Sequence, residues 1–170
     1  MGGPPRLSRT CSGYGLEANW DITKCYENVD RGKLIQAATA LGYPMTLLRL
    51  SLASYEWGRS LRGPGGIHTH PVHATRGIVA GSTYALYELV LYMWTPLQPI
   101  LALHPTALHL HVDDVSFEAE APSATSALHN FTSIGRAIAH ALEHTLALPL
   151  APDKASVIAT TPALARRGAK

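Results

Sequence analysis

Residues 107–119, Ala107-Leu-His-Leu-His-Val-Asp-Asp-Val-Ser-Phe-Glu-Ala119, are the stretch that decides the predicted fold. The first half of this stretch alternates apolar and polar side chains with a period of two, which is typical of a β-strand with one buried face. Asp113-Asp114 is a turn signal, since aspartate favours turns. Val115 and Phe117 then begin a second strand pattern. The stretch therefore predicts a hairpin with a tight turn at Asp113-Asp114.

Upstream of this hairpin, the spacing of apolar residues predicts one strand and three helices. The strand covers residues 16–23, with Trp20 and Ile22 on its apolar face. The helices cover 30–41, 44–57 and 82–93. Residues 58–76 are predicted as a loop or short strand, since they contain Gly63-Pro64-Gly65-Gly66. The expected boundary residues are Asp30 and Ser82 as N-caps, Gly42 as the end of the first helix, and Pro96 and Pro99 as the end or kink of the third.

Downstream of the hairpin, the sequence predicts a long helix over 123–146 and a short last strand over 157–160. Ser123 is the expected N-cap of this helix. Its expected buried stripe is Leu128, Phe131, Ile134, Ile138 and Leu142. A few strands separated by helices around a hairpin predict an α+β fold, an antiparallel sheet backed by helices. We expect a flexible tail over 1–15, one domain over 16–162 and a basic tail over 163–170.

The composition narrows the class of protein. The chain has 170 residues, of which 46% are hydrophobic and 15% are charged, with a formal net charge of +2. This balance excludes a generally disordered chain. Two cysteines, Cys11 and Cys25, exclude a disulfide scaffold and a four-cysteine zinc site. The most apolar stretch, 84–103, is interrupted by Glu88, so we expect no membrane span and no membrane partner. The N-terminus has no apolar segment typical of a signal peptide. We expect an intracellular protein, and nuclear and cytoplasmic locations stay equally open.

Three aspartates are the strongest candidates for chemistry. Asp21 lies at the end of an apolar strand, and Asp113 and Asp114 lie at the predicted turn, 92 positions further along the chain. Carboxylates in apolar surroundings are costly unless they are paired or bind a cation. If the two strands are neighbours, we expect oxygens of Asp21 and Asp113 within about 6 Å of each other, a separation that a pair of Mg²⁺ ions permits. The alternative is an ordinary Asp-Asp turn.

Four segments in order resemble the motifs of reverse transcriptases, especially the non-LTR retrotransposon type. Asp21-Ile-Thr-Lys-Cys-Tyr26 resembles motif A, and Arg76-Gly77-Ile-Val-Ala-Gly81-Ser82 resembles motif B. His111-Val-Asp113-Asp114 resembles motif C, and Leu148-Pro-Leu-Ala-Pro-Asp-Lys154 resembles motif D. The resemblance runs from about residue 16 to residue 160. It implies the palm of an RNA-directed DNA polymerase, in which a sheet carries the motif A strand, the motif C hairpin and a short motif D strand.

The resemblance also implies roles for individual residues. Asp21 and Asp113 would bind two Mg²⁺ ions, or Mn²⁺ in their place, and Asp114 would support this metal site. Tyr26 would lie under the sugar of the incoming nucleotide and favour deoxynucleoside triphosphates. Lys154 would neutralise or protonate the pyrophosphate leaving group. Backbone near the template and nucleotide would be supplied by Gly77, Gly81 and Ser82. The implied partners are a primer on an RNA or DNA template.

Two residues depart from the family pattern: Ala80 replaces a frequent glutamine, and His111 replaces an aromatic or small residue. Only 20 residues precede Asp21, and only 16 follow Lys154. The family's fingers and thumb would therefore be supplied by other parts of a parent polyprotein. We expect this chain alone to be inactive in processive synthesis.

The stretch from Trp57 to Tyr87 contains no acidic residue, and its arginines are predicted to contact nucleic-acid phosphates. These arginines are Arg59, Arg62 and Arg76. Tyr55 and Trp57 could stack on bases, but we expect them to pack in the core. Two alternative functions stay open. One is a degenerate, non-catalytic palm with weak nucleic-acid binding. The other is a zinc-binding module on His68, His70 and His73, whose spacing is ligand-like.

Overall fold

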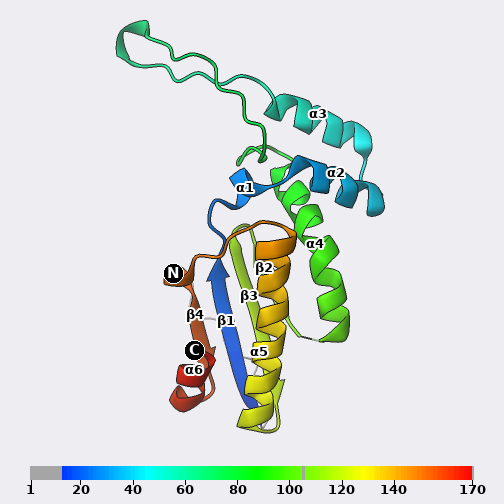
Figure 1. Cartoon of the computed structure of the whole chain (residues 1–170), viewed down its shortest axis with the longest axis vertical. Coiled ribbons are helices and arrows are strands. Elements are labelled where there is room, and N and C mark those ends of the chain that lie inside the picture. The colour runs from blue at the N-terminus through cyan, green and yellow to red at the C-terminus, as the bar shows by residue number, and fades with distance from the viewer. Residues whose placement is uncertain (1–12, 105, 170) are drawn as a thin grey trace.

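The computed structural model describes residues 13–104 and 106–169, and it confirms the predicted α+β class. A four-stranded antiparallel sheet is backed by helices (Figure 1). No helix in the described ranges is long and apolar enough to cross a membrane. The strands and helices are β1 (Tyr14–Asp21), α1 (Cys25–Asn28), α2 (Arg31–Ala40), α3 (Met45–Tyr55), α4 (Ala85–Leu103), β2 (Leu108–His111), β3 (Asp114–Ala121), α5 (Ala124–His140), β4 (Ser156–Ala159) and α6 (Pro162–Gly168).

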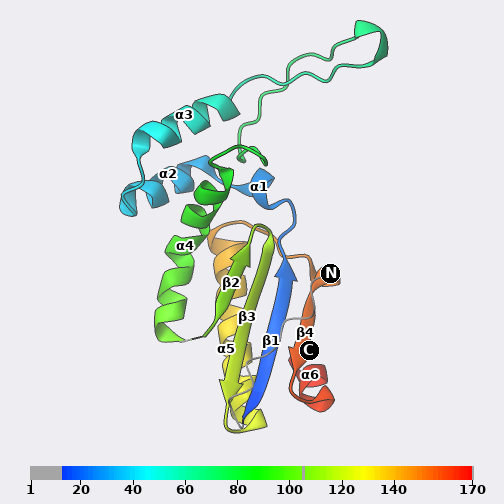
Figure 2. The same cartoon turned by 180° about the vertical axis from the view of Figure 1, so that it is seen from behind.

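The sheet has the strand order β2-β3-β1-β4 and two unlike faces. One face carries buried apolar side chains such as Ala18 and Phe117, which are paired across β1 and β3. Helix α5 covers this face, and the ring of its Phe131 stacks on Phe117 at 5.2 Å between centroids. No helix of the described residues covers the opposite face, which Figure 2 shows from the front. Because side chains alternate along a strand, the residues between the buried ones, including Asp21 and Asp114, point to the uncovered face.

The predicted hairpin forms, but its turn is one residue earlier than expected. His111 pairs with Asp114 across β2 and β3, so the two turn residues are Val112 and Asp113. Val112 has a φ of 61°, whereas Asp113 does not have a positive φ. This pattern matches a type II′ turn, which usually has glycine at its first central position. The sequence did not predict this turn, because a valine occupies the position where glycine is usual.

The predicted first and last helices match the structure closely. The side chain of Asp30 caps α2 by accepting a hydrogen bond from the Lys33 backbone at 3.0 Å, and Gly42 follows the helix with a φ of 69°. Ser123 caps α5 by accepting from the backbone of Ser126. A turn of π-helix, Ala141–Thr145, continues α5 almost to the predicted end. The predicted stripe is buried except for Leu128, which is half-buried. Helix α3 also forms as predicted, directly after Pro44.

The third predicted helix differs at both ends. Ser82 is not its N-cap, because α4 begins only at Ala85 after Tyr84. The prolines do not end it either: α4 continues through Pro96 and Pro99 to Leu103. Proline removes one backbone donor, but packing of an apolar helix face can outweigh that cost. Here the buried residues Leu89, Tyr92, Met93 and Leu97 extend past Pro96, and Ile100, beyond Pro99, is partly buried against the same core.

The two ends of the predicted domain also differ from the expectation. Strand β1 begins at Tyr14, so the last residues of the expected 1–15 tail are in the sheet, and residues 1–12 lie outside the described ranges. The expected basic tail over 163–170 is mostly helix, since α6 covers Pro162–Gly168. Thr161 caps α6, and Leu164 is only 2% exposed. Burial of this one leucine docks the segment on the rest of the domain, which its basic composition did not predict.

Residues 57–76 form a two-stranded arm that projects from the body, as both views show (Figures 1 and 2). Backbone hydrogen bonds link Arg59 with Val72, and an isolated bridge joins Arg62 to His68. Tyr55, at the base of the arm, is buried as expected. Trp57 is 71% exposed, so the expectation that it packs in the core is wrong.

Candidate active site

Asp21 and Asp114 lie at one end of the uncovered sheet face, and Asp113 lies in the adjoining hairpin turn. Asp21, the last residue of β1, pairs directly with Asp114, the first residue of β3. The backbone N–H of Ile22 donates to the carbonyl of Asp113 at 2.8 Å. His111 on β2 pairs with Asp114, so His111, Asp114 and Asp21 form one row across three strands. The fold thus brings motif A beside motif C, while the predicted separation of the Asp21 and Asp113 carboxyl oxygens stays a prediction.

Lys154 lies at the same end of the sheet, next to Asp21. Its Nζ lies 2.9 Å from Oδ2 of Asp21. A backbone hydrogen bond from Ala151 to the carbonyl of Asp21 holds the preceding segment in place at 2.9 Å. A shallow pocket of about 410 Å³ opens here. Its polar lining includes Asn19, Asp21, His109, His111, Asp114 and Lys154.

The ion pair sets the electrostatics of the pocket. The hydrogen bond and charge of Asp21 raise the pKa of Lys154 above its ordinary value, so its ammonium is positive at neutral pH. The Lys154 side chain is 60% exposed and that of Asp21 is 18% exposed. The chain's own cation therefore partly neutralises the motif A carboxylate from the solvent side.

A buried thiol lies beneath the same aspartates. The Sγ of Cys25 is 4.0 Å from the carbonyl of Val112, the first turn residue of the hairpin. Burial, followed by the charges of Asp113, Glu27 and Asp21, raises the pKa of the Cys25 thiol to about 12. Cys25 is therefore a neutral packing residue.

Backbone hydrogen bonds join the motif B turn to α1 and to the residue that follows it, and they fix the backbone at Tyr26. The N–H of Ile78 donates to the Tyr26 carbonyl at 2.9 Å, and that of Gly77 donates to the Val29 carbonyl at 2.8 Å. Gly77 has a φ of +80°, and a Cβ there would lie 2.8 Å from the Glu27 carbonyl oxygen. Burial raises the pKa of the half-buried Tyr26 phenol. The close approach at Gly77 is thus within the chain, and its contact with a nucleotide stays a prediction.

Gly81 and Ser82 differ in their surroundings. Gly81 has a φ of +85° and open space around it. The Ser82 hydroxyl points inward and lies 3.0 Å from the hydroxyl of Tyr55. Tyr55 in turn donates to Oε2 of the fully buried Glu88 at 2.8 Å. Sequence analysis missed this buried pair, although a single carboxylate in the apolar 84–103 stretch was the signal for a partner.

The donor groups at the sheet end suit a magnesium ion, since carboxylate oxygens are its usual protein ligands. In the described ranges, however, no three His, Cys, Asp or Glu side chains are already gathered around a point that could hold a metal ion. This holds for the three aspartates and for His68, His70 and His73 alike. Cation binding at Asp21 would require Lys154 to release this carboxylate.

The three predicted nucleic-acid arginines do not all lie together. Arg59 and Arg76 line one pocket at the base of the arm, while Arg62 lies further along it. Arg31 and His73 share this pocket. Sequence analysis missed Arg31 and named His73 only as a candidate zinc ligand, because the two residues meet only through the folding of the chain.

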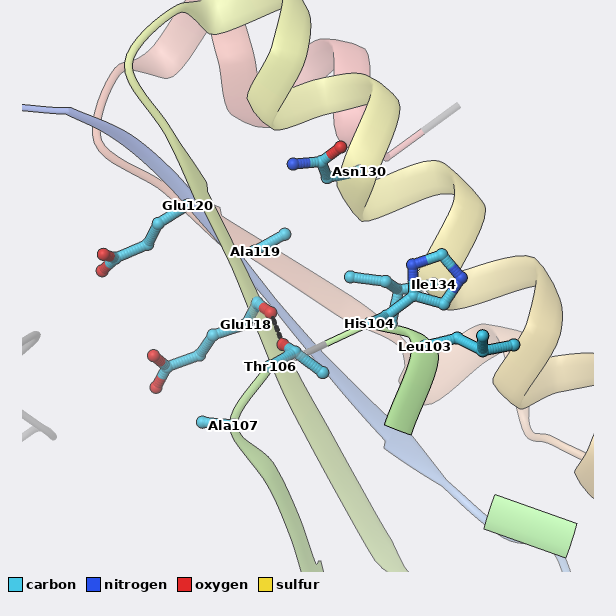
Figure 3. Close-up of a pocket in the computed structure, with 9 residues that line it drawn as sticks. All are labelled: Leu103, His104, Thr106, Ala107, Glu118, Ala119, Glu120, Asn130 and Ile134. Atoms are coloured by element: carbon cyan, nitrogen blue, oxygen red, sulfur yellow. Dashed lines mark hydrogen bonds between the residues drawn. The ribbon is translucent and has the colours of Figure 1, made fainter. Parts of the chain in front are cut away.

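A further pocket, of about 610 Å³, lies away from all predicted site residues. It opens between the end of α4, the β2–β3 hairpin and α5 (Figure 3). Figure 3 shows Glu118 and Glu120 extending to one side of β3, with Asn130 and Ile134 on α5 at the other. The Thr106 hydroxyl donates to the Glu118 carbonyl at its rim. The side chains diverge, so this pocket offers less for catalysis than the smaller one at Asp21.

Comparisons with known proteins identify the fold. No family model matches the sequence, and no curated protein matches it. Among solved structures, a Candida tropicalis telomerase in complex with a TWJ fragment of telomeric RNA is 10% identical, with a TM-score of 0.65 over 91% of this chain and 27% of that chain. The corresponding Candida albicans complex is 12% identical, with a TM-score of 0.63 over 86% and 28%.

A third similar structure is apo telomerase from Candida tropicalis, truncated from the C-terminal domain. It is 10% identical and has a TM-score of 0.59 over 86% of this chain and 31% of that chain. The chain thus spans only 27–31% of the telomerase chains that it matches. The chain therefore shares its fold with part of these telomerase chains.

Proposed function

We propose that this chain is the palm of an RNA-directed DNA polymerase, which adds deoxynucleotides to a primer 3′ end. The observation that supports this best is the meeting of Asp21 and Asp114 at one end of an uncovered sheet face, with Asp113 in the adjoining turn. The shared fold of three telomerase structures supports the same class. Within this class of polymerases, we propose the non-LTR retrotransposon type because the motif sequences resemble it.

Each residue of the site would have a separate role in nucleotidyl transfer. When bound, two Mg²⁺ ions would stabilise charge on the attacking and leaving oxygens of the phosphoryl group. Asp21 and Asp113 would hold these ions, with Asp114 in support. Lys154 would then be free of Asp21 and could neutralise or protonate the leaving pyrophosphate. The ring of Tyr26 would exclude a 2′-hydroxyl, because a packed site resists deformation.

The proposed substrates are deoxynucleoside triphosphates and a primer on an RNA or DNA template. Two of the similar telomerases are described as complexes with a telomeric RNA fragment, which supports a nucleic-acid partner here. Positioning supplies most of the catalysis in phosphoryl transfer. Because the match spans less than a third of each telomerase chain, we propose that fingers and thumb come from outside these 170 residues.

Thermal melts with divalent cations test the metal site. We expect Mg²⁺ and Mn²⁺ to raise the melting temperature more than Zn²⁺, since a ligand that binds only the folded state stabilises it by mass action, about 2.7 kcal/mol at 100 times its Kd. Asp21→Asn or Asp113→Asn should abolish the Mg²⁺ effect. Lys154→Ala should increase it, because Asp21 then has no competing cation.

Glu120→Gln is the matched control, since it removes a carboxylate from the same uncovered face at the opposite end of β3. Its Mg²⁺ effect should equal that of the unmodified chain. Stabilisation by Zn²⁺ alone, abolished by His70→Ala, would favour the zinc module instead. If no cation stabilises the chain, the degenerate palm becomes the better account.

A further inference from the structure

The base of the arm contains a second pocket, of about 360 Å³, that the catalytic chemistry does not use. Arg31 enters it from the start of α2, Arg59 and His73 from the two strands of the arm, and Arg76 from the turn before α4. The imidazole of His73 packs closely on Gly58, where a Cβ would lie 2.9 Å from its Cε1. The side chains that line this pocket therefore come from segments that only the folded chain brings together.

The positive charge in this pocket has no carboxylate partner. Arg31 donates to the carbonyls of Gly77 at 2.8 Å and Tyr55 at 3.2 Å, and Arg76 donates to the carbonyl of Asn28 at 2.6 Å. Backbone carbonyls orient these guanidinium groups but do not neutralise them. Within the described ranges the one ion pair is Asp21–Lys154, so Glu27, the acidic residue of the lining, pairs with none of the arginines. Three like charges that line one pocket repel one another, and an anion would relieve that repulsion.

The surroundings of the pocket indicate which anion fits. The chain from 57 to 87 carries no acidic residue, so the positive field continues along the arm. Trp57, next to the pocket in sequence, exposes 71% of its surface. Arginines that track phosphates beside an exposed aromatic ring are the usual means of binding single-stranded nucleic acid without sequence preference. A free nucleotide would not need the extended acid-free arm.

We infer that this arm-base pocket, formed by Arg31, Arg59, His73 and Arg76, binds a backbone phosphate of a single-stranded nucleic acid, with a neighbouring base stacked on Trp57. The inference rests on the proposed function in taking the strand to be the template. It assigns the arm the role of holding the nucleic-acid strand, separately from the carboxylate site. Arg31 also braces α2 against the motif B turn, so its replacement would not be a clean test.

Fluorescence anisotropy with a labelled single-stranded oligonucleotide tests this in EDTA, over a series of salt concentrations. The variant with Arg59→Gln and Arg76→Gln should bind about tenfold more weakly. Its slope of log affinity against log salt should fall by about 0.7, since the loss of one phosphate contact removes about 0.7 for a single strand. Arg59→Gln alone, on the exposed arm, should lower the affinity and the slope in the same direction by smaller amounts. Trp57→Ala should weaken binding at least about fivefold with the slope unchanged, because stacking releases no counterions.

Arg136→Gln is the matched control, since it removes the same charge from an exposed position on α5 and should leave both values unchanged. Unchanged affinity and slope in the Arg59 and Arg76 variants would overturn the inference. So would competition by a deoxynucleoside triphosphate that these substitutions abolish, since the pocket would then hold the free nucleotide. Asp113→Ala should bind the oligonucleotide normally in EDTA, so failure of the polymerase proposal would leave this result intact.

Discussion

At the scale of single residues, Gly77 carries the strictest steric requirement near the site. It lies where the motif B turn crosses α1, with a left-handed φ of +80°. A Cβ would approach the backbone of Glu27 at 2.8 Å to its oxygen and 2.9 Å to its Cα. Neither contact can relax by a side-chain rotation. The position of Tyr26 therefore depends on a residue that has no side chain.

We expect Gly77→Ala to lower the free energy of unfolding by about 3 kcal/mol, because it combines left-handed strain of about 1–2 kcal/mol with a backbone collision. Gly81→Ala is the matched control, since Gly81 has a similar φ of +85° but nothing within 4 Å. It should cost only the conformational strain. Urea unfolding of the two variants measures both values. Equal losses would show that the close contact with Glu27 does not constrain the turn.

At the scale of helices and strands, elements with local signals were predicted well. Asp30 and Ser123 cap α2 and α5 as expected, because an N-cap acts within four residues. The turn of the hairpin and the course of α4 were not predicted. Val112 adopts a φ of 61° that its residue type disfavours, and the prolines of α4 are overridden by a buried face. In both places tertiary packing outweighs local preference.

The candidate site, too, was predicted only in part from the sequence. The motifs were sufficient to predict which aspartates share a sheet end, since their strands are neighbours in the structure. The sequence did not predict that Lys154 pairs directly with Asp21, nor that Arg31 and His73 join Arg59 and Arg76. These contacts join segments far apart in the chain, and no local pattern encodes them.

Helix α6 is the element whose role is most open to test. Leu164 is buried at 2% exposure, and α6 lies so close to β1 that a Cβ on Gly168 would be 2.7 Å from Leu16 Cδ2. We expect Leu164→Ala to reduce the free energy of unfolding by about 2–4 kcal/mol, as for other buried leucines. Leu103→Ala, at a position 78% exposed, should change it by less than about 0.5 kcal/mol. Denaturant unfolding checks this, and similar small losses would mean that α6 is not docked on the sheet.

At the scale of the whole molecule, the fold separates two tasks in space. The uncovered face of the sheet presents Asp21, Asp114 and Lys154 at one end, and the arm extends from the same end of the body (Figures 1 and 2). The helices bury the opposite face and make the sheet rigid. A nucleic-acid strand held at the base of the arm would thus lie near the carboxylates without contacting the core.

The most direct test of the polymerase proposal is a primer-extension assay with Mg²⁺ on a primed RNA template. The parent protein that supplies fingers and thumb should extend the primer, and the same protein with Asp113→Ala should not. The 170-residue chain alone should give no processive extension, because we propose that the parts that hold the triphosphate and duplex in line lie outside it. Robust extension by the isolated chain would contradict the need for those parts. Unchanged extension by the parent with Asp113→Ala would contradict the catalytic assignment itself.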